Sequence, residues 1–264
     1  MKFTKLLKII KQEFRNYLDD LFSHYPILLT LDEQRILSEI KTNGFYVIPN
    51  FYTETECIEV RHEINNLLKK YKDQVQVDQT GSDHRIWGAD RISPLIRKFF
   101  TNSFVDKIVN AYQKTDNKVG FTLAARLDYK PDNLGSGGGW HRDTAHSKQI
   151  KAILYLSLVT KTSGPFQYIK GSHLSLSVIR ETFASDFSLN QNRFTNEEIE
   201  KLLTKNNLQK LQTFTAKAGT LILVDTRGLH RGMPILESDR FALTNYYWNQ
   251  ELIPSHLAKL LVKQ

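Results

Sequence analysis

Three side chains in this sequence have the types and the spacing of a metal site: His141, Asp143 and the distant His230. Two imidazoles and one carboxylate form the facial triad that holds Fe(II) in non-haem oxygenases and leaves positions open for O₂ and a co-substrate. In an extended backbone, residues i and i+2 point the same way. The H-x-D pair therefore suits a strand end or a tight turn, and the third ligand must come from another strand.

Arg240 is the second candidate, because it follows His230 closely and opens an apolar run. Residues 231–239 contain Gly232 and Pro234, a composition typical of a connection between two antiparallel strands. This would place His230 and Arg240 on neighbouring strands. A guanidinium holds a carboxylate through two parallel hydrogen bonds, which lysine does not reproduce. We therefore expect Arg240 to bind the far carboxylate of a dicarboxylate co-substrate that contacts the metal at its other end.

These residues, with two longer stretches, resemble the phytanoyl-CoA dioxygenase family. The stretches are GWHRD at residues 139–143 and GPFQYIKGSH at residues 164–173. The resemblance covers residues 45–248 and implies an oxygenase dependent on Fe(II), 2-oxoglutarate and O₂, built on a double-stranded β-helix. It implies that His141, Asp143 and His230 bind the metal and that Arg240 anchors 2-oxoglutarate. The sequence departs from the family at Lys170, usually proline, which should alter a turn without altering the chemistry.

The periodicity of the chain predicts a mainly β fold with flanking helices, a jelly roll of the cupin type that holds a metal in its mouth. Strands are predicted at residues 44–49, 119–129, 151–159, 220–225 and 240–248 from short apolar runs rich in β-branched and aromatic residues. Capping boxes that begin at Thr30, Thr53 and Thr195 predict helices after each. We expect residues 1–43 to form a helical extension packed on the core, and residues 44–264 to form the oxygenase domain.

Two residues on the strand that enters the triad, Arg126 and Tyr129, are candidates for contact with 2-oxoglutarate or substrate. A buried ion pair is the competing role for Arg126. Trp140 either excludes water from the metal or fills the core. The loop at residues 130–139 contains GSGGG and is expected beside the metal as a mobile segment, or else as a flexible hairpin connection.

Three further histidines have less specific surroundings. His84 lies either in a substrate wall or in an ordinary loop. His146 faces either the site or solvent. His173 belongs to the Gly-Ser-His turn and is expected to orient the site through a hydrogen bond, without binding metal.

The composition excludes several classes of protein. The chain has 264 residues, a net charge of +8 and a single cysteine, so an internal disulfide and a cysteine-based metal cluster are excluded. No apolar run is long enough to cross a bilayer, and no signal peptide or nucleic-acid-binding motif is recognisable. A lone thiol fits a reducing compartment, and we expect a cytoplasmic location.

The positive charge has several explanations, of which an ordinary basic surface is the simplest. A basic mouth formed by Arg85, Lys130, Arg142, Arg227 and Arg231 would favour an anionic substrate. These side chains would leave no net field if they paired with Asp128, Asp225 and Asp239. The amphipathic stripe at residues 2–22 (Phe3, Leu7, Ile10, Phe14, Tyr17, Leu21) is expected to pack on its own domain; peripheral membrane contact or a partner helix are the alternatives.

The function predicted from these features is hydroxylation of an unactivated C–H bond of a small-molecule metabolite, with release of succinate and CO₂. The same scaffold can also support desaturation, cyclisation or epimerisation. A third alternative is a non-enzymatic jelly-roll binding module. Neither the substrate nor the oligomeric state follows from the sequence, because one fold serves many substrates.

Overall fold

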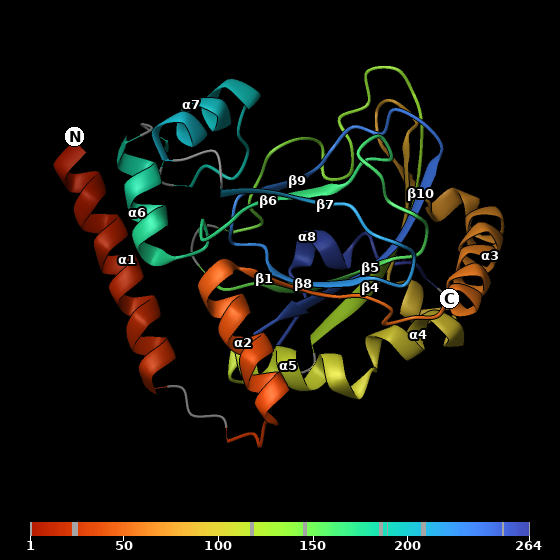
Figure 1. Ribbon diagram of the computed structural model, residues 1–264, viewed down its shortest axis with the longest axis horizontal. Coiled ribbons are helices and arrows are strands. Elements are labelled where there is room, and N and C mark those ends of the chain that lie inside the picture. Colours follow the sequence, from red (N-terminus) through yellow and green to blue (C-terminus); the bar gives the residue numbers. More distant parts are fainter. Residues whose placement is uncertain are drawn as a thin grey trace.

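Two antiparallel β-sheets face each other in a computed structural model of the chain (Figure 1). The structure describes residues 2–22, 26–116, 119–144, 147–184, 187–188, 190–206, 210–249 and 251–263. The larger sheet has the order β1-β8-β5-β10-β4-β3-β2 and the smaller sheet has the order β7-β6-β9. The strands are β1 (Phe45–Ile48), β2 (Gln76–Val77), β3 (Asp83–Trp87), β4 (Val119–Asp128), β5 (Ile150–Tyr155), β6 (Phe166–Ile169), β7 (Leu211–Phe214), β8 (Leu221–Asp225), β9 (His230–Gly232) and β10 (Asp239–Trp248). This arrangement confirms the predicted jelly roll.

Helices cover the outer face of the larger sheet (Figure 1). They are α2 (Leu31–Asn43), α3 (Glu54–Lys70), α4 (Pro94–Phe100) and α5 (Ser103–Gln113), with short 3₁₀ turns at Lys72–Gln74 and Ala89–Arg91. The remaining helices are α1 (Lys2–Phe22), α6 (Ser175–Ala184), α7 (Asn196–Asn206) and α8 (Ser255–Ala258). The main core lies between α2–α5 and the sheet, and it includes the buried Cys57.

The alternation of β5 explains how the site is lined. Ala152 and Leu154 point into the core beneath the helices. Lys151, Ile153 and Tyr155 therefore point to the opposite face, into the space between the two sheets. The same period of two along β10 puts Arg240, Ala242, Thr244 and Tyr246 into that space.

The predicted capping boxes are present at Thr30, Thr53 and Thr195, each with a reciprocal bond to the glutamate three residues later. Helix α2 ends at Gly44, whose φ of 94° is costly for other residues. A Cβ at Gly44 would also collide with the ring of Tyr168. The turn that leads into β1 therefore requires glycine for its backbone and for its packing.

The prediction that the apolar stripe of α1 packs on its own domain is wrong. Leu7, Ile10, Phe14 and Tyr17 are exposed, whereas Ile9 and Glu13, on the adjacent face of the helix, are buried. Helix α1 contacts α6, and a buried ion pair between Glu13 and Arg227 fixes its orientation. The side chains of Phe3 and Leu21 lie outside the described residues. Within the described part of the chain, no helix has the length and apolarity needed to cross a membrane.

Candidate metal centre and its two cavities

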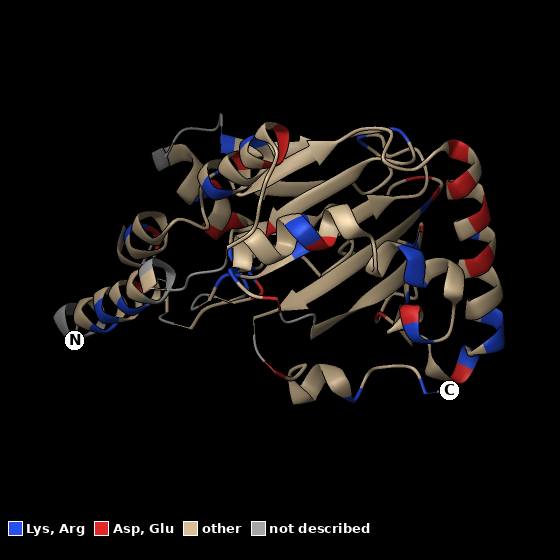
Figure 2. Cartoon of the chain, turned by 90° about the horizontal axis from the view of Figure 1, so that it is seen from below, with Lys and Arg blue, Asp and Glu red and all other residues tan. Residues whose placement is uncertain are grey.

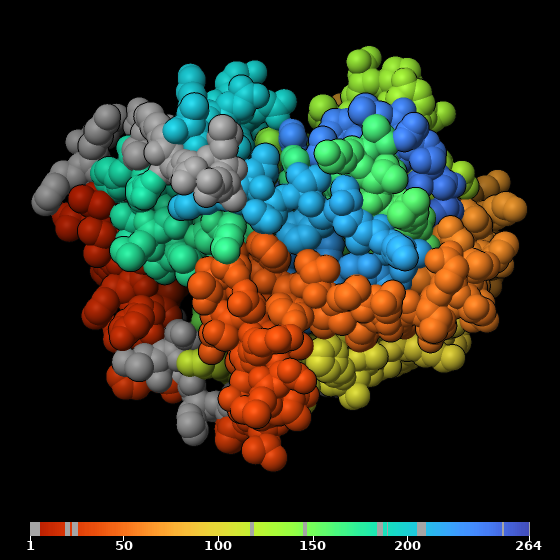
Figure 3. All heavy atoms as spheres, viewed as in Figure 1, coloured from red at the N-terminus to blue at the C-terminus, as the bar shows by residue number. Residues whose placement is uncertain are grey.

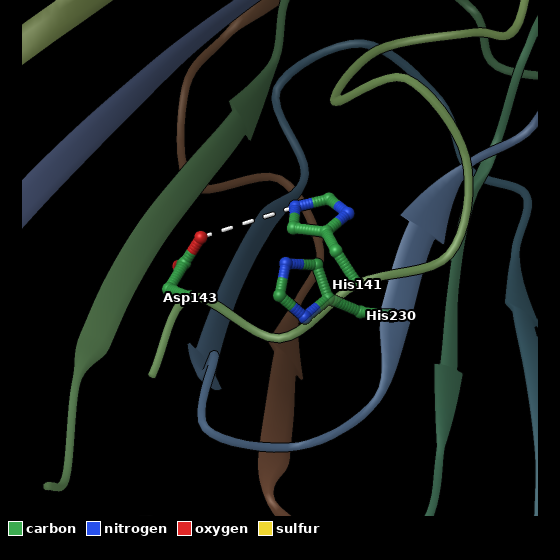
Figure 4. A group of neighbouring side chains, drawn as sticks. All are labelled: His141, Asp143 and His230. Atoms are coloured by element: carbon green, nitrogen blue, oxygen red, sulfur yellow. Dashed lines mark ion pairs between the residues drawn. The ribbon is translucent and has the colours of Figure 1, made fainter. Parts of the chain in front are cut away.

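His141, Asp143 and His230 come together at one edge of the space between the sheets (Figure 4). One ligand atom from each lies within 4.8 Å of the other two, and Nε2 of His141 is 3.9 Å from Oδ1 of Asp143. The backbone sets this geometry. His141 and His230 exchange two N–H to carbonyl bonds of 2.9 and 2.8 Å, and the Asp143 N–H donates to the carbonyl of Thr226 at 3.0 Å. Two distant segments are thus joined at the ligands themselves.

Each imidazole is oriented by a carbonyl two residues before it. Nδ1 of His141 lies 2.9 Å from the oxygen of Gly139, and Nδ1 of His230 lies 2.8 Å from the oxygen of Gly228. Since a carbonyl only accepts, Nδ1 carries the proton in both rings and Nε2 keeps its lone pair. Metal-binding histidines are held in this way, with the second ring nitrogen bonded to an acceptor. The donor set therefore fits a divalent metal ion.

The charges of the three ligands suit metal binding at neutral pH. Burial lowers the pKa of His141 to about 4, and burial together with the nearby His141 lowers the pKa of His230 well below its usual value. Burial alone would raise the pKa of Asp143, but the ammonium of Lys151 and the two imidazoles hold it below its usual range. Two neutral imidazoles and one carboxylate are the protonation states that a metal requires.

An inner cavity of about 90 Å³ runs from the two histidines to Arg240. Its walls include Tyr155, Phe166 and Thr244. The guanidinium of Arg240 is buried and donates from Nη1 to the carbonyl of Gly164, but its Nε has no hydrogen-bond partner among the described residues. Burial lowers the pKa of Arg240. A buried cation with an unused donor is costly, and an anionic ligand in the cavity would compensate it.

The prediction that His230 and Arg240 lie on neighbouring strands is wrong. His230 lies on β9 of the smaller sheet and Arg240 on β10 of the larger sheet. The connection at residues 233–238 crosses from one sheet to the other. The two residues consequently face the inner cavity from opposite walls, which leaves room for a ligand between them.

A larger outer cavity of about 510 Å³ meets the inner one at the metal ligands. Both cavities share Arg85, Gly137, His141, Lys151 and Tyr246. Asp143 lines only the outer cavity, whereas His230 and Arg240 line only the inner one. The ligand set therefore separates a small compartment that ends at a guanidinium from a larger compartment that ends at Trp87, Trp248 and Leu257.

Arg126 and Tyr129 are not among the described residues that line either cavity. Arg126 follows Ala125, which faces the inner cavity, so its side chain lies on the opposite face of β4. There it bonds to Asp128 and Asn65 and covers the ring of Phe241. Tyr129 follows the end of β4 and is exposed. An ion pair, the competing role of Arg126, is present, but it is partly exposed and not buried as expected.

The other sequence candidates take supporting positions. Trp140 is buried in a core cluster beneath the guanidinium of Arg231, so it fills the core. His84 lies 3.6 Å from Asp128 and lines neither cavity. His173 is buried and bonds through Nε2 to the carbonyl of Lys41, so the expected hydrogen bond is present; its role in orienting the site stays a prediction. His146 lies outside the described residues.

Two turns show why their residue types matter. The glycine-containing loop lies beside the ligands, as predicted, and a Cβ at Gly137 would come within 2.5 Å of the His141 ring. The departure at Lys170 also has a structural role. Its N–H donates to the carbonyl of Lys210 at 2.8 Å, a bond that proline lacks the hydrogen to make. The next residues continue the turn, and Ser172 Oγ accepts from the N–H of Leu229, beside His230.

The predicted basic mouth is only partly present. Arg85 and Arg142 line the outer cavity, where they pair with Asp83 and Glu181. Arg227 is buried against Glu13, Arg231 bonds to Gln167 and Asn196, and Lys130 does not line the cavity. The acidic partners that are present, Asp83, Glu181 and Glu13, differ from the expected partners Asp128, Asp225 and Asp239.

Sequence reasoning missed Lys151, Arg193 and Tyr246. The signal for Lys151 was available: it shares the inward-pointing positions 151, 153 and 155 of an otherwise apolar strand. A lysine at such a position is buried and needs a partner. Arg193 carried no local signal, because the fold brings it to Gly137 and Gly138, whose carbonyls it contacts.

Comparison with known proteins agrees with this geometry. The family model described as phytanoyl-CoA dioxygenase (PhyH) matches residues 40–240. Ectoine dioxygenase of Halomonas elongata is 24% identical over 219 residues, which is 74% of this chain and 63% of that enzyme. The chain thus spans less than two thirds of that relative's length.

Solved structures share the fold at low sequence identity. The epimerase SnoN, in complex with Fe³⁺, alpha ketoglutarate and nogalamycin RO, superposes with a TM-score of 0.64 at 14% identity, over 87% of this chain and 89% of its own. EctD from S. alaskensis with bound Fe gives a TM-score of 0.60 at 15% identity, covering 85% and 80%. HygX from Streptomyces hygroscopicus with nickel and 2-oxoglutarate gives 0.53 at 18% identity, covering 84% and 88%.

Proposed function

Because the chain belongs to the phytanoyl-CoA dioxygenase family, we propose that it is an Fe(II)- and 2-oxoglutarate-dependent dioxygenase that hydroxylates an unactivated C–H bond of a small molecule, with release of succinate and CO₂. The observation that carries this proposal is the position of the ligand triad between two cavities, one of which ends at a buried guanidinium. Iron, 2-oxoglutarate and O₂ would supply the oxidising chemistry that protein side chains lack.

The inner cavity is the proposed site of 2-oxoglutarate. Arg240 would hold the far carboxylate, and the unused Nε gives the guanidinium a second donor for it. Tyr155 fixes the neighbouring wall, since its hydroxyl accepts from the N–H of Phe166 and donates to the carbonyl of Phe214. Because Arg240 is buried, the co-substrate would also be shielded from water there.

The outer cavity is the proposed site of the primary substrate. It lies on the Asp143 side of the triad, opposite the co-substrate, so a substrate there reaches the metal without displacing 2-oxoglutarate. Aromatic rings of Trp87, Tyr246 and Trp248 pack along one wall. Such a wall would position an apolar part of the substrate and orient the reacting C–H bond.

We infer an anionic substrate from the charges around this cavity. Its lining contains Arg85, Arg142, Lys148, Lys151, Arg193 and His256, whereas Asp143 is its only acidic residue among those described. Asp83 and Glu181 pair with two of the arginines from outside the cavity, and Asp143 pairs with Lys151, so the lining holds more cationic than anionic side chains. A carboxylate or phosphate on the substrate fits this lining better than an ammonium group.

Succinate formation is the primary test of the enzyme proposal. Anaerobic addition of 2-oxoglutarate to the Fe(II)-loaded protein should produce a charge-transfer absorption band, and admission of O₂ with a true substrate should release one succinate per product. A screen of small metabolites for perturbation of that band would identify the substrate. Matched anionic and neutral analogues belong in the same screen.

The mass of the product separates hydroxylation from desaturation, cyclisation and epimerisation. Among the solved structures, the carbocyclase SnoK represents cyclisation and the epimerase SnoN represents epimerisation. Metal and metabolite binding without any succinate would favour the binding module. The anionic-substrate proposal fails separately, if the second-order rate constant is indifferent to ionic strength and a neutral analogue turns over equally well. Attraction by exposed charges should weaken as the screening length falls to about 3 Å at 1 M salt.

A cytoplasmic location is a further proposal. It is supported by the lone, buried Cys57, whose pKa burial raises to about 11. A thiol of this kind has no need of an oxidising compartment.

A further inference from the structure

Helix α1 presents its apolar face outward. The exposed fractions of Leu7, Ile10, Phe14 and Tyr17 are 52%, 44%, 59% and 61%. Their spacing of three, four and three residues aligns them along one side of the helix, which we call the outer stripe. Figure 1 and Figure 3 show α1 at one end of the molecule, beside α6. Contiguous exposed apolar surface is rare on soluble monomeric proteins, and where it occurs it commonly marks an interaction site.

The buried face of α1, beside the outer stripe, fixes the helix in this orientation. Glu13 and Ile9 are buried, and the Glu13 carboxylate pairs with the buried Arg227, three residues before His230. Rotating the outer stripe inward would bring Glu13 into solvent and leave Arg227 buried without this carboxylate, which is costly. The outward position of the stripe is therefore built into the fold.

A row of basic side chains follows the outer stripe. Lys8, Lys11 and Arg15 are exposed and lie at spacings of three and four residues, so they form a line next to Leu7 and Phe14. Figure 2 shows blue bands of Lys and Arg along α1. Glu13 is buried. The exposed side of the helix is thus apolar in its middle and basic along one edge.

We propose that α1 binds an anionic lipid surface, lying parallel to it with the outer stripe in the headgroup region and the basic row against lipid phosphates and carboxylates. An apolar face rich in Phe, Tyr and Leu with Lys and Arg beside it is the composition of helices that lie in a membrane interface. The basic row favours an occupant that carries negative charge. Anionic lipids supply that complementary charge.

Vesicle binding by the full-length protein tests this proposal. The protein should sediment with phosphatidylcholine vesicles that contain phosphatidylserine, and much less with phosphatidylcholine alone. The variant K8Q/K11Q/R15Q should weaken partitioning by about a hundredfold. The variant L7S/F14S should abolish it at any vesicle charge. Both variants alter exposed side chains and should unfold at the temperature of the unaltered protein.

Matched controls come from other parts of the chain. Lys69, Lys70 and Lys72 are exposed on and after α3, far from α1 (Figures 1 and 2), and Leu252 is an exposed apolar residue near the C-terminus. The variants K69Q/K70Q/K72Q and L252S should bind vesicles as the unaltered protein does. Equal binding to neutral and anionic vesicles would overturn the proposal, as would no binding. A concentration-dependent dimer that L7S/F14S dissociates, without vesicle binding, would assign the surface to a second copy instead.

Discussion

The ammonium of Lys151 lies 2.5 Å from Oδ2 of Asp143, so the carboxylate is shared between the metal-ligand set and a buried lysine. Oδ1 faces His141, and Oδ2 faces Lys151. The lysine also contacts the ring of Tyr246, with Nζ 4.0 Å from its centroid. This arrangement neutralises Asp143 before any metal binds, and it leaves one oxygen directed toward the ligand set.

Lys151→Met should destabilise the metal-free protein by about 3–5 kcal/mol, because removal of one partner leaves a buried charge uncompensated. A bound divalent metal would compensate Asp143 in place of the lysine, so the metal-loaded variant should lose less stability. By linkage, the variant should then bind Co(II) or Fe(II) more tightly than the unaltered protein. Urea unfolding with and without metal and metal titration give both quantities. Lys151→Arg keeps the charge and should show a much smaller effect; weaker metal binding by Lys151→Met would contradict the argument.

Metal binding should require His141, Asp143 and His230 together. Alanine at any one of them should abolish turnover and greatly weaken Fe(II) affinity, since three ligands are the minimum protein set for this type of site. Anaerobic metal titration measures the affinity, and succinate release measures turnover. His84→Ala serves as a control, because this histidine pairs with Asp128 away from the cavities. Full activity in Asp143→Ala would rule out the triad.

Arg240→Ala should raise the apparent 2-oxoglutarate requirement by at least about tenfold while metal affinity stays nearly unchanged. A charge-assisted hydrogen-bonded pair contributes about 1.5–3 kcal/mol, and 1.4 kcal/mol corresponds to tenfold in affinity. Titration of the anaerobic absorption band measures this directly. Arg126→Ala is the matched control on the opposite face of the sheet and should leave the requirement unchanged. An effect of Arg126→Ala equal to that of Arg240→Ala would contradict the placement of the anchor.

The free energy of unfolding of the metal-free protein should decrease as the pH falls from about 6.5 toward 4. The pKa of His141 is about 4 in the folded protein, against 6.5 as its ordinary value, so only the unfolded chain gains the proton in this interval. His230, with a lowered pKa, acts in the same direction. Denaturant titrations across the interval measure the slope. The slope should be shallower in His141→Asn/His230→Asn, and an unchanged slope would assign the effect to other groups.

Much of the fold follows from local sequence. The capping boxes at Thr30 and Thr53 begin α2 and α3, because a side-chain oxygen at the N-cap and a glutamate three residues later satisfy free backbone N–H groups. The strands β4, β5, β8 and β10 follow from apolar, β-branched runs, although β5 ends at Tyr155, earlier than predicted. The short strands β3, β6 and β7 were not recognised, because polar residues interrupt their apolar runs (DHRIW, FQYI and LQTF).

The sequence by itself determined the types and the order of the candidate ligands and the candidate anchor, because H-x-D, the distal histidine and Arg240 are chemical identities that folding does not change. Tertiary structure decided which sheet carries each of these residues and which arginine faces the cavity. Arg240 on β10 points inward and Arg126 on β4 points outward, because successive side chains of a strand point to opposite faces of the sheet. It also decided the orientation of α1. Periodicity identifies an apolar face, but the buried pair of Glu13 with Arg227, 214 residues apart, turns that face to the outside.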